Sequence, residues 1–252
     1  MNKFLIKIIA PIHHAINHIL IKIWYDRSSN PERIRALKGI HAKDKRCFLV
    51  GNGPSLTAKD LNMLKNEITF ASNKIYHVFD KTEFRPTYYI TDDARTISRN
   101  SEEIKKIPAR NTLVGLQHFL SYKKLYRNSH VILFRVKDSV EKKTLHPTVK
   151  VRVDDYVNSG HTVLFPICEF ALYMGFKEIY LIGVDFNYTN SQAHFYVKDK
   201  DDTTYKTNPN EQLYAYEALK TYTSQNNIKI YNATRGGKLE VFPRMELEKI
   251  LL

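Results

Sequence analysis

The stretch Phe48–Leu56 reads FLVGNGPSL, and it decides the fold. An apolar run typical of a buried strand stops there at two glycines, an asparagine and a proline. Gly51 and Gly53 permit positive φ angles and close approach of the backbone. Pro54 and Ser55 predict the start of a helix whose free N–H groups favour an anion, with Ser55 as its cap. The stretch therefore predicts a strand, a ligand-binding loop and a helix; a tight turn without a ligand is the alternative.

The same order of strand, loop and helix recurs along the chain. Short runs rich in β-branched and aromatic residues predict strands, and helical stretches fall between several of them. This alternation is typical of a mostly parallel sheet with helices on both faces, a Rossmann-like α/β fold. The predicted strands are 46–50, 68–72, 87–91, 112–116, 130–134, 178–183 and 228–233; the predicted helices are 94–106, 117–127, 161–175 and 211–225; the segments 135–158 and 187–210 are expected to be lid-like loops.

The chain of 252 residues carries a formal net charge of +13, which predicts an anionic partner. The 39 Lys and Arg residues are spread along the sequence and form no motif that reads nucleic acid. A membrane surface or a phosphorylated or acidic substrate is therefore expected instead.

Residues 1–24 predict a basic amphipathic helix, because apolar residues recur at helical spacing and most of the remainder is lysine or histidine. The apolar run is too interrupted to span a bilayer. We expect this helix to lie on an anionic membrane surface, or to dock on its own domain or a neighbouring subunit. Residues 1–30 are thus read as helix and linker, and residues 31–252 as one nucleotide-sugar-binding catalytic domain.

A second candidate site begins at Asn158, Ser159 and Gly160, which precede a predicted helix and offer another place to capture an anion. Pro166 is expected to kink that helix, and Gly175 to end it. Asp185 follows the next strand directly, at the edge of the sheet where ligands collect. Its alternatives are to orient a loop or to accept hydrogen bonds from backbone N–H groups.

Two further places carry chemistry. Asp92 and Asp93 end another strand, where they are expected to bind Mg²⁺ or a ribose, or to cap the next helix; capping suits Asp93 better, and Asp92 is the better ligand. His194 lies in the loop after Asp185, where it is expected to cover the pocket and act as a general base.

These segments together resemble two groups of bacterial proteins. FLVGNGPSL, ASNKIY, an NSG that opens a helix, and ALYMGFKEIYLIGVDFNY are similar to the CMP-sialic-acid-dependent sialyltransferases of glycosyltransferase family 42. They also resemble the MptE-like proteins, which are named after a hydroxymethylpterin pyrophosphokinase and are kin to motility accessory factors. The C-terminal IYNATRGGKLEVFP looks more like the second group. The resemblance covers roughly residues 45–240.

The resemblance implies roles for particular residues. Asn52 and Asn73 match asparagines that contact the cytidine nucleotide, and Asp92 falls where the sialyltransferases have another. Asn158 and Ser159 occupy the place of a Thr-Ser pair near the donor. His194 is the nearest candidate for the catalytic histidine, although it stands closer to the Asp185 strand than in the family. Tyr188 or Tyr196 is expected to donate a hydrogen bond to the departing phosphate.

The expected function is that of an inverting glycosyltransferase that moves a nonulosonic acid from a CMP-activated donor to a surface glycan such as a lipooligosaccharide or capsule. No metal or other cofactor is expected, because CMP leaves with one phosphate that local dipoles can neutralise. The alternative is a Mg²⁺-dependent pyrophosphokinase in which Asp92, Asp93 and Asp185 hold the metal. The expected location is the inner face of the bacterial cytoplasmic membrane, and a homo-oligomer is left open.

Overall fold

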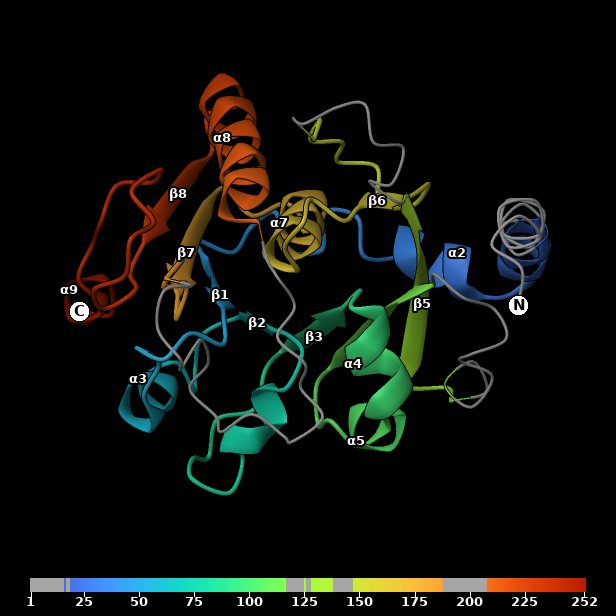
Figure 1. The fold of residues 1–252 in the computed structure, drawn as a ribbon, viewed down its shortest axis with the longest axis horizontal. Helices are drawn as coiled ribbons and strands as arrows, with labels where there is room; N and C mark the ends of the chain where they lie inside the picture. Colours follow the sequence, from blue (N-terminus) through green and yellow to red (C-terminus); the bar gives the residue numbers. More distant parts are fainter. Residues whose placement is uncertain (1–15, 17–18, 117–124, 126–127, 138–146, 188–207) are drawn as a thin grey trace, which may run out of the picture.

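The computed structural model describes residues 16, 19–116, 125, 128–137, 147–187 and 208–252. In this part of the chain eight strands form one parallel sheet, in the order β6-β5-β4-β3-β2-β1-β7-β8 (Figure 1). The Rossmann-like α/β fold predicted from the sequence is confirmed. The strands are β1 (Cys47–Val50), β2 (Thr69–Ala71), β3 (Tyr88–Thr91), β4 (Asn111–Leu116), β5 (Val131–Lys137), β6 (Val157–Asn158), β7 (Glu178–Ile182) and β8 (Lys229–Asn232).

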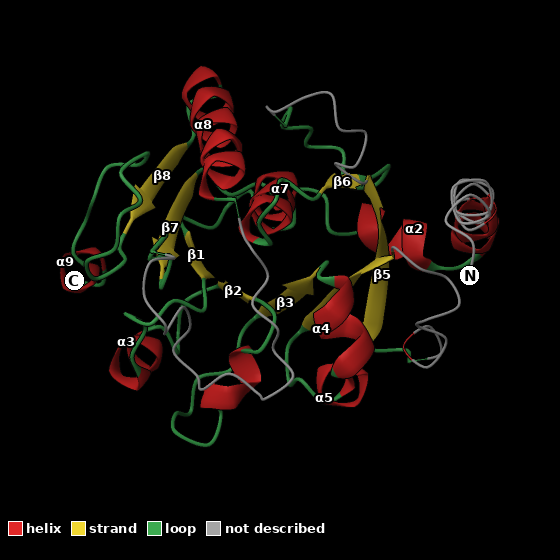
Figure 2. Ribbon diagram, viewed as in Figure 1, coloured by secondary structure: helices red, strands yellow, loops and turns green. Residues whose placement is uncertain are grey.

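Helices cover both faces of the sheet. Figure 2 shows α2, α7 and α8 on one face and α3, α4 and α5 on the other. The described helices are α2 (Asn30–Arg35), α3 (Ala58–Met63), the 3₁₀ helix η1 (Ile75–Val78), α4 (Ala94–Arg99), α5 (Ser101–Lys105), α7 (Leu164–Met174), α8 (Pro209–Gln225) and α9 (Leu247–Ile250).

Strand β1 shows why the central strands are apolar throughout. Side chains alternate between the two faces of a strand, so Leu49 packs in the cluster that contains α7 and α8, whereas Phe48 packs in the cluster that contains α3 and α4. Both are fully buried. A parallel sheet covered on both faces needs such continuous apolar runs, and this is the pattern that identified the strands.

The order of the strands fixes where a ligand can bind. The chain moves outward from β1 to β6, then returns to place β7 on the other side of β1. Helices that follow β1 and β7 therefore diverge to opposite faces, and a crevice opens at the carboxyl ends of these two strands. The loop Gly51–Ser55 and the residue Asp185 lie at this switch point.

All seven predicted strands are present, and β6 was not predicted. It is a pair of residues in the segment expected to be a loop, and it pairs with the end of β5. The predicted helix 94–106 is divided into α4 and α5 at Asn100, whose side chain donates to the Thr96 carbonyl at 3.1 Å. Residues 117–124, 126–127, 138–146 and 188–207, which include most of the predicted lid, lie outside the described residues.

Helix α7 corrects one expectation and confirms another. It begins at Leu164, so Pro166 lies in its first turn, where a missing N–H breaks no helical hydrogen bond. The expected kink is therefore not required. Gly175 ends the helix with φ of 103°, as predicted, because glycine adopts this left-handed conformation without strain.

Of the N-terminal helix, residue 16 and residues 19–27 are described and helical. Ile21 and Tyr25 are buried against Leu116 at the end of β4. The helix is thus docked on its own domain through this face. No helix among the described residues is both long and apolar enough to cross a bilayer.

Candidate nucleotide site at the switch point

The loops that follow β1 and β7 are packed directly against each other. The Gly53 amide donates to the Gly183 carbonyl at 2.8 Å. A Cβ on Gly51 would lie 2.4 Å from the Gly183 carbonyl oxygen, and one on Gly53 would lie 1.9 Å from Asp185 Oδ2. The close backbone approach predicted for these glycines is therefore made to the β7 loop. Neither glycine is among the residues with positive φ.

Asp185 joins the two loops through its carboxylate. Its Oδ2 accepts from Ser55 Oγ at 2.8 Å, and its Oδ1 accepts from the Ser55 amide at 3.2 Å. Burial raises the pKa of Asp185, and the hydrogen bonds from Ser55 oppose that shift. The structure therefore gives Asp185 the alternative role, orienting a loop and accepting from a backbone N–H.

The prediction that Ser55 caps the helix after the first loop is wrong. Helix α3 begins at Ala58 and is capped by Thr57, which forms a reciprocal capping box with Asp60. Asp60 also accepts from Arg235 at 2.8 Å. The amide of Ser55 meets a carboxylate already, so this loop does not hold an open anion site at Ser55.

Asn52 has an unmatched polar atom. Its Nδ2 donates to the Ser72 carbonyl at 3.2 Å, which fixes the amide across the ends of β1 and β2. Its Oδ1 is buried, and no described residue donates to it. A buried acceptor left without a donor costs about 1–3 kcal/mol, so such atoms are rare and call for an explanation.

The carboxyl ends of β2 and β3 place three more predicted residues at the same edge. Asn73 has φ of 50°, and its Oδ1 accepts from Thr91 Oγ1 at 2.9 Å. Asp93 caps α4 by accepting from the Arg95 and Thr96 amides, which confirms that prediction. Asp92 is buried, with its Cα and Cβ facing Gly115 in β4.

A buried glutamate holds the segment before α7. Glu169 accepts from the Lys150 amide at 3.1 Å, from the Asn158 amide at 3.0 Å and from Asn158 Nδ2 at 3.1 Å. Asn158 Nδ2 also donates to the Thr148 carbonyl, so only the side-chain oxygen of Asn158 is left for a ligand. Burial raises the pKa of Glu169 to about 7, although these hydrogen bonds and the nearby Lys150 charge lower it.

Residues with a strained backbone, marked by positive φ angles, occur mainly after the carboxyl ends of strands. Three of the four described non-glycine residues with positive φ follow carboxyl ends of strands: Asn73 after β2, His161 after β6 and Phe186 after β7. Such conformations persist only where the surroundings impose them, and they cluster at functional sites. His161 was not selected from the sequence. It directly follows the NSG motif, but the positive φ that distinguishes it cannot be recognised from the residue types in the sequence.

The described residues do not assemble a metal site. They include no group of three or more His, Cys, Asp or Glu side chains placed to share an ion. Of the three carboxylates named for the pyrophosphokinase, Asp93 is engaged as a helix cap and Asp185 with Ser55.

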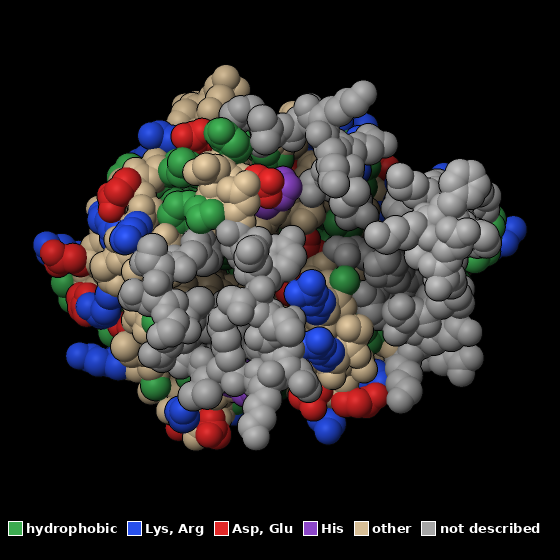
Figure 3. Space-filling view, viewed as in Figure 1, with side chains coloured by type: hydrophobic (Ala, Val, Ile, Leu, Met, Phe, Trp, Pro, Cys, Tyr) green, Lys and Arg blue, Asp and Glu red, His purple; other side chains and the backbone are tan. Residues whose placement is uncertain are grey.

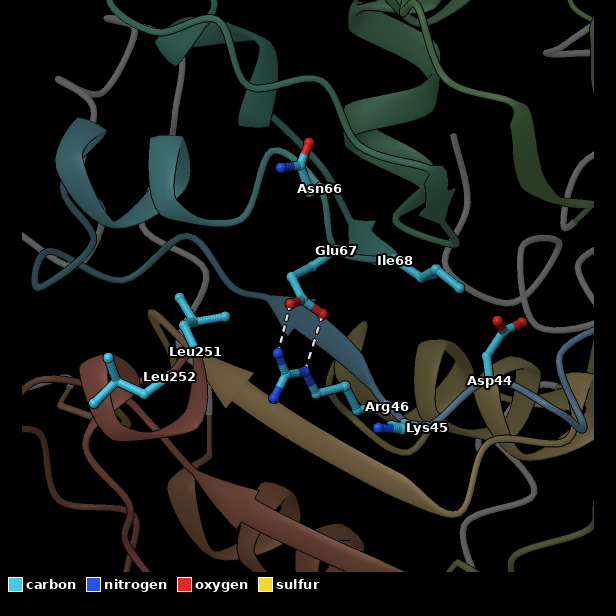
Figure 4. Close-up of a pocket in the computed structure, with 8 residues that line it drawn as sticks. All are labelled: Asp44, Lys45, Arg46, Asn66, Glu67, Ile68, Leu251 and Leu252. Carbon is cyan, nitrogen blue, oxygen red and sulfur yellow. Dashed lines mark hydrogen bonds and ion pairs between the residues drawn. The ribbon is translucent and has the colours of Figure 1, made fainter.

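A cavity of about 550 Å³ lies at the opposite edge of the sheet, near the amino ends of β1 and β2. Figure 4 shows Arg46 and Glu67 paired across it, with Nη2···Oε1 at 2.7 Å and Nε···Oε2 at 3.1 Å. Ligands of this fold class collect at the carboxyl ends, so we do not assign the function to this cavity.

The structure thus brings Gly51, Asn52, Gly53, Ser55 and Asp185 together. Three predicted catalytic residues, His194, Tyr188 and Tyr196, lie outside the described residues. Their roles stay predictions.

Comparison with known proteins supports both resemblances noted in the sequence. Residues 25–191 match the model of a family described as 6-hydroxymethylpterin diphosphokinase MptE-like. No curated protein matches the sequence.

Solved structures that share the fold include two proteins. The MAf glycosyltransferase from Magnetospirillum magneticum AMB-1 has a TM-score of 0.55 at 17% identity, over 84% of this chain and 34% of its own. The sialyltransferase CstII from Campylobacter jejuni, in complex with a substrate analogue, cytidine-5′-monophosphate, has a TM-score of 0.50 at 20% identity, over 80% of this chain and 85% of its own. The chain thus spans about a third of the first protein.

The glycine contacts predict the effect of adding one methyl group. Gly53→Ala places a Cβ against Asp185 Oδ2 and the Gly183 carbonyl, and such overpacking costs about 1–3 kcal/mol of unfolding free energy. Urea denaturation measures the loss. In the double variant with Asp185→Ala, the loss is smaller than the sum of the two single losses, because one clash is gone. Strict additivity would contradict the contact.

Glu169 predicts a pH dependence of stability. Between pH 4.5 and about 7 the Glu169 carboxyl is protonated in the folded protein, whereas it has lost its proton in the unfolded chain. Unfolding then releases a proton, so the free energy of unfolding falls as pH rises through this window, by roughly 3 kcal/mol for a shift of this size. Urea denaturation at several pH values should show this decrease in the wild type and lose it in Glu169→Gln. The exposed control Glu103→Gln should keep it; the same slope in Glu169→Gln would contradict the assignment.

Proposed function

The chain belongs to the MptE-like family, and from this premise we propose that it is a glycosyltransferase that uses a CMP-activated nonulosonic acid. The observation that carries the proposal is the buried Oδ1 of Asn52, an acceptor without a described donor at the switch point. An amino group of a base or a hydroxyl of a ribose supplies the donor it lacks. Of the two solved structures compared above, one is named a glycosyltransferase and the other a sialyltransferase in complex with CMP.

The place of the phosphate follows from charge. Asp185 already meets the Ser55 amide, and its carboxylate would repel a phosphate there. Helix α7 has eleven residues, and its N-cap residue Val163 makes no side-chain hydrogen bond to it, although the Leu164 amide donates to Thr162 Oγ1 at 3.4 Å. Its dipole favours an anion, so we place the phosphate there, next to Ser159 and Gly160. A single phosphate needs only such local dipoles, and the mechanism requires no metal.

In the proposed reaction an acceptor hydroxyl attacks the anomeric carbon with inversion while CMP departs. A histidine takes the proton of that hydroxyl, for which the sequence suggests His194. Tyr188 or Tyr196 donates to the departing phosphate oxygen. The acceptor is a bacterial surface glycan, such as a lipooligosaccharide or a capsule.

The name of the family favours a second candidate, a Mg²⁺-dependent diphosphokinase. It would need carboxylates that share a metal with the ATP phosphates. Asp93 and Asp185 are engaged elsewhere, which weighs against it. Nucleic acid is not favoured either, since the described Lys and Arg side chains are scattered among acidic ones on the face shown in Figure 3.

A thermal-shift panel of CMP, CDP, UDP, GDP and ATP, each with and without EDTA, tests the proposal. CMP should raise the melting temperature selectively, and EDTA should not change the shift. Asn52→Ala should weaken CMP binding by about 1–2 kcal/mol, as the loss of a buried hydrogen bond does. Asn66→Ala, in the opposite cavity, is the control. A shift that is selective for ATP and lost in EDTA would replace this function with the diphosphokinase.

We also propose that the protein lies on the inner face of the bacterial cytoplasmic membrane. The N-terminal helix docks through Ile21 and Tyr25, yet four apolar side chains on its other faces stay exposed, at 42–58%. Residues 1–25 contain no Asp or Glu, which suits an anionic lipid surface. In Figure 1 the described part of this helix stands at the edge of the molecule, beside α2. The exposed residues are Ile16, Ile19, Leu20 and Ile23.

Replacing Ile16, Ile19 and Ile23 with glutamine should release the protein from vesicles of phosphatidylglycerol and phosphatidylethanolamine, because less apolar surface enters the bilayer. Co-sedimentation measures binding, and Ile40→Gln, at a residue 41% exposed, is the control. Unchanged vesicle binding, or a loss of self-association instead, would contradict the membrane and favour a second copy of the chain.

A further inference from the structure

A strained turn follows β6. Gly160 and His161 both have φ of 58°, so two consecutive residues are left-handed. A Cβ on Gly160 would lie 2.3 Å from Phe165 Cγ, which explains the glycine. His161 pays a steric cost in this conformation, and its carbonyl is held by Gln212 Nε2 at 3.1 Å. The backbone of His161 is therefore fixed by the left-handed turn before it and by the hydrogen bond from Gln212 to its carbonyl.

The side chain of His161 is oriented by a carboxylate. Its Nδ1 lies 3.3 Å from Glu211 Oε2, and the two side chains are 29% and 37% exposed. Glu211 lies in the first turn of α8, where the helix dipole favours a negative charge. An imidazole with Nδ1 turned to a carboxylate keeps its Nε2 for proton transfer, which is the arrangement of a base and its orienting group.

A chain of contacts through α8 connects the His161–Glu211 pair to the switch point. Gln212 and Tyr216 are one turn apart on α8, and the Tyr216 ring meets the Phe186 ring with centroids 6.0 Å apart. Phe186 directly follows Asp185. His161 also stands next to Ser159 and Gly160, where the phosphate is placed above. The anomeric carbon is one bond from a phosphate oxygen, so an attacking hydroxyl must come close to this region.

We propose that His161, oriented by Glu211, and not the His194 that the sequence suggests, is the general base of the transfer reaction; the inference rests on the proposed function and replaces only its base. Nε2 accepts the proton of the acceptor hydroxyl as the oxygen bonds to the anomeric carbon. The bond from that carbon to the phosphate oxygen breaks, and its electron pair leaves with CMP. The imidazolium then returns its proton to water. Glu211 is a positioning residue.

The test uses variants that tolerate the left-handed backbone. Glycine and asparagine both adopt it readily, so His161→Gly and His161→Asn should fold. CMP release from CMP-N-acetylneuraminic acid is measured with a galactoside acceptor. We expect kcat to fall at least about 100-fold, with KM within about three-fold. Added imidazole should restore part of the activity of His161→Gly, because it fills the vacated space as a base.

Parallel variants separate the roles. His194→Ala should keep more than about a tenth of the wild-type kcat, and the exposed His130→Asn should be unchanged. Glu211→Gln should lower kcat about ten-fold with KM unchanged, and Glu211→Asp should lose less. The inference is overturned if His161→Asn is fully active, or if imidazole rescues only His194→Ala.

A second measurement tests the role of His161 even if the wild-type protein does not use CMP-N-acetylneuraminic acid as donor. Diethyl pyrocarbonate modifies accessible imidazoles, and mass spectrometry follows each histidine. The nucleotide that binds in the thermal-shift panel should slow modification of His161 at least about ten-fold and leave His130 unchanged. Equal rates with and without nucleotide would overturn the inference. If the wild type is inactive with this donor but the nucleotide protects His161 from modification, only the identity of the donor is wrong and the inference about His161 stands.

Discussion

The carboxylate of Asp185 holds the loop after β1 against the loop after β7, and the way these two loops pack at the switch point depends on it. Ser55 donates to it twice, and Gly53 has no side chain because that carboxylate occupies the space a Cβ would need. The sheet order makes this contact necessary, since β1 and β7 are neighbours whose helices leave toward opposite faces. The crevice that results is the place where this fold class binds ligands.

The same contact decides which groups are left for a ligand. A carboxylate beside the Ser55 amide disfavours a phosphate at the first loop, so in the proposed function the N-terminus of α7, whose dipole favours an anion, is the anion site. Asn52, bridged to Ser72, keeps an unmatched oxygen for a base or ribose. Glu169, a residue of α7, accepts from the Asn158 amide, and the strained residue His161 follows three residues after Asn158. The proposed site thus combines the loops after β1 and β7, which the sheet makes neighbours, with the turn before α7, which Gln212 on α8 contacts.

Sequence patterns predicted the sheet well because burial on both faces demands continuous apolar runs, as in β1. These patterns failed where two neighbouring residues could equally well play the same structural role. Ser55 and Thr57 are equally good caps by residue type, and only the long-range contact with Asp185 takes Ser55 away. Gly53 signalled a close approach, but the partner proved to be protein. His161 could not have been found, because a positive φ and a carboxylate fifty residues later leave no periodic signal.

The central claim is that a nucleotide binds at the switch point between β1 and β7, and a crystal structure of the protein with CMP tests it most directly. The account predicts CMP density at the carboxyl edge, with a donor atom of the nucleotide within hydrogen-bond distance of Asn52 Oδ1 and the phosphate near Gly160. Density in the cavity beside Arg46 and Glu67 at the opposite edge would contradict it, and so would a switch point that stays empty at saturating CMP.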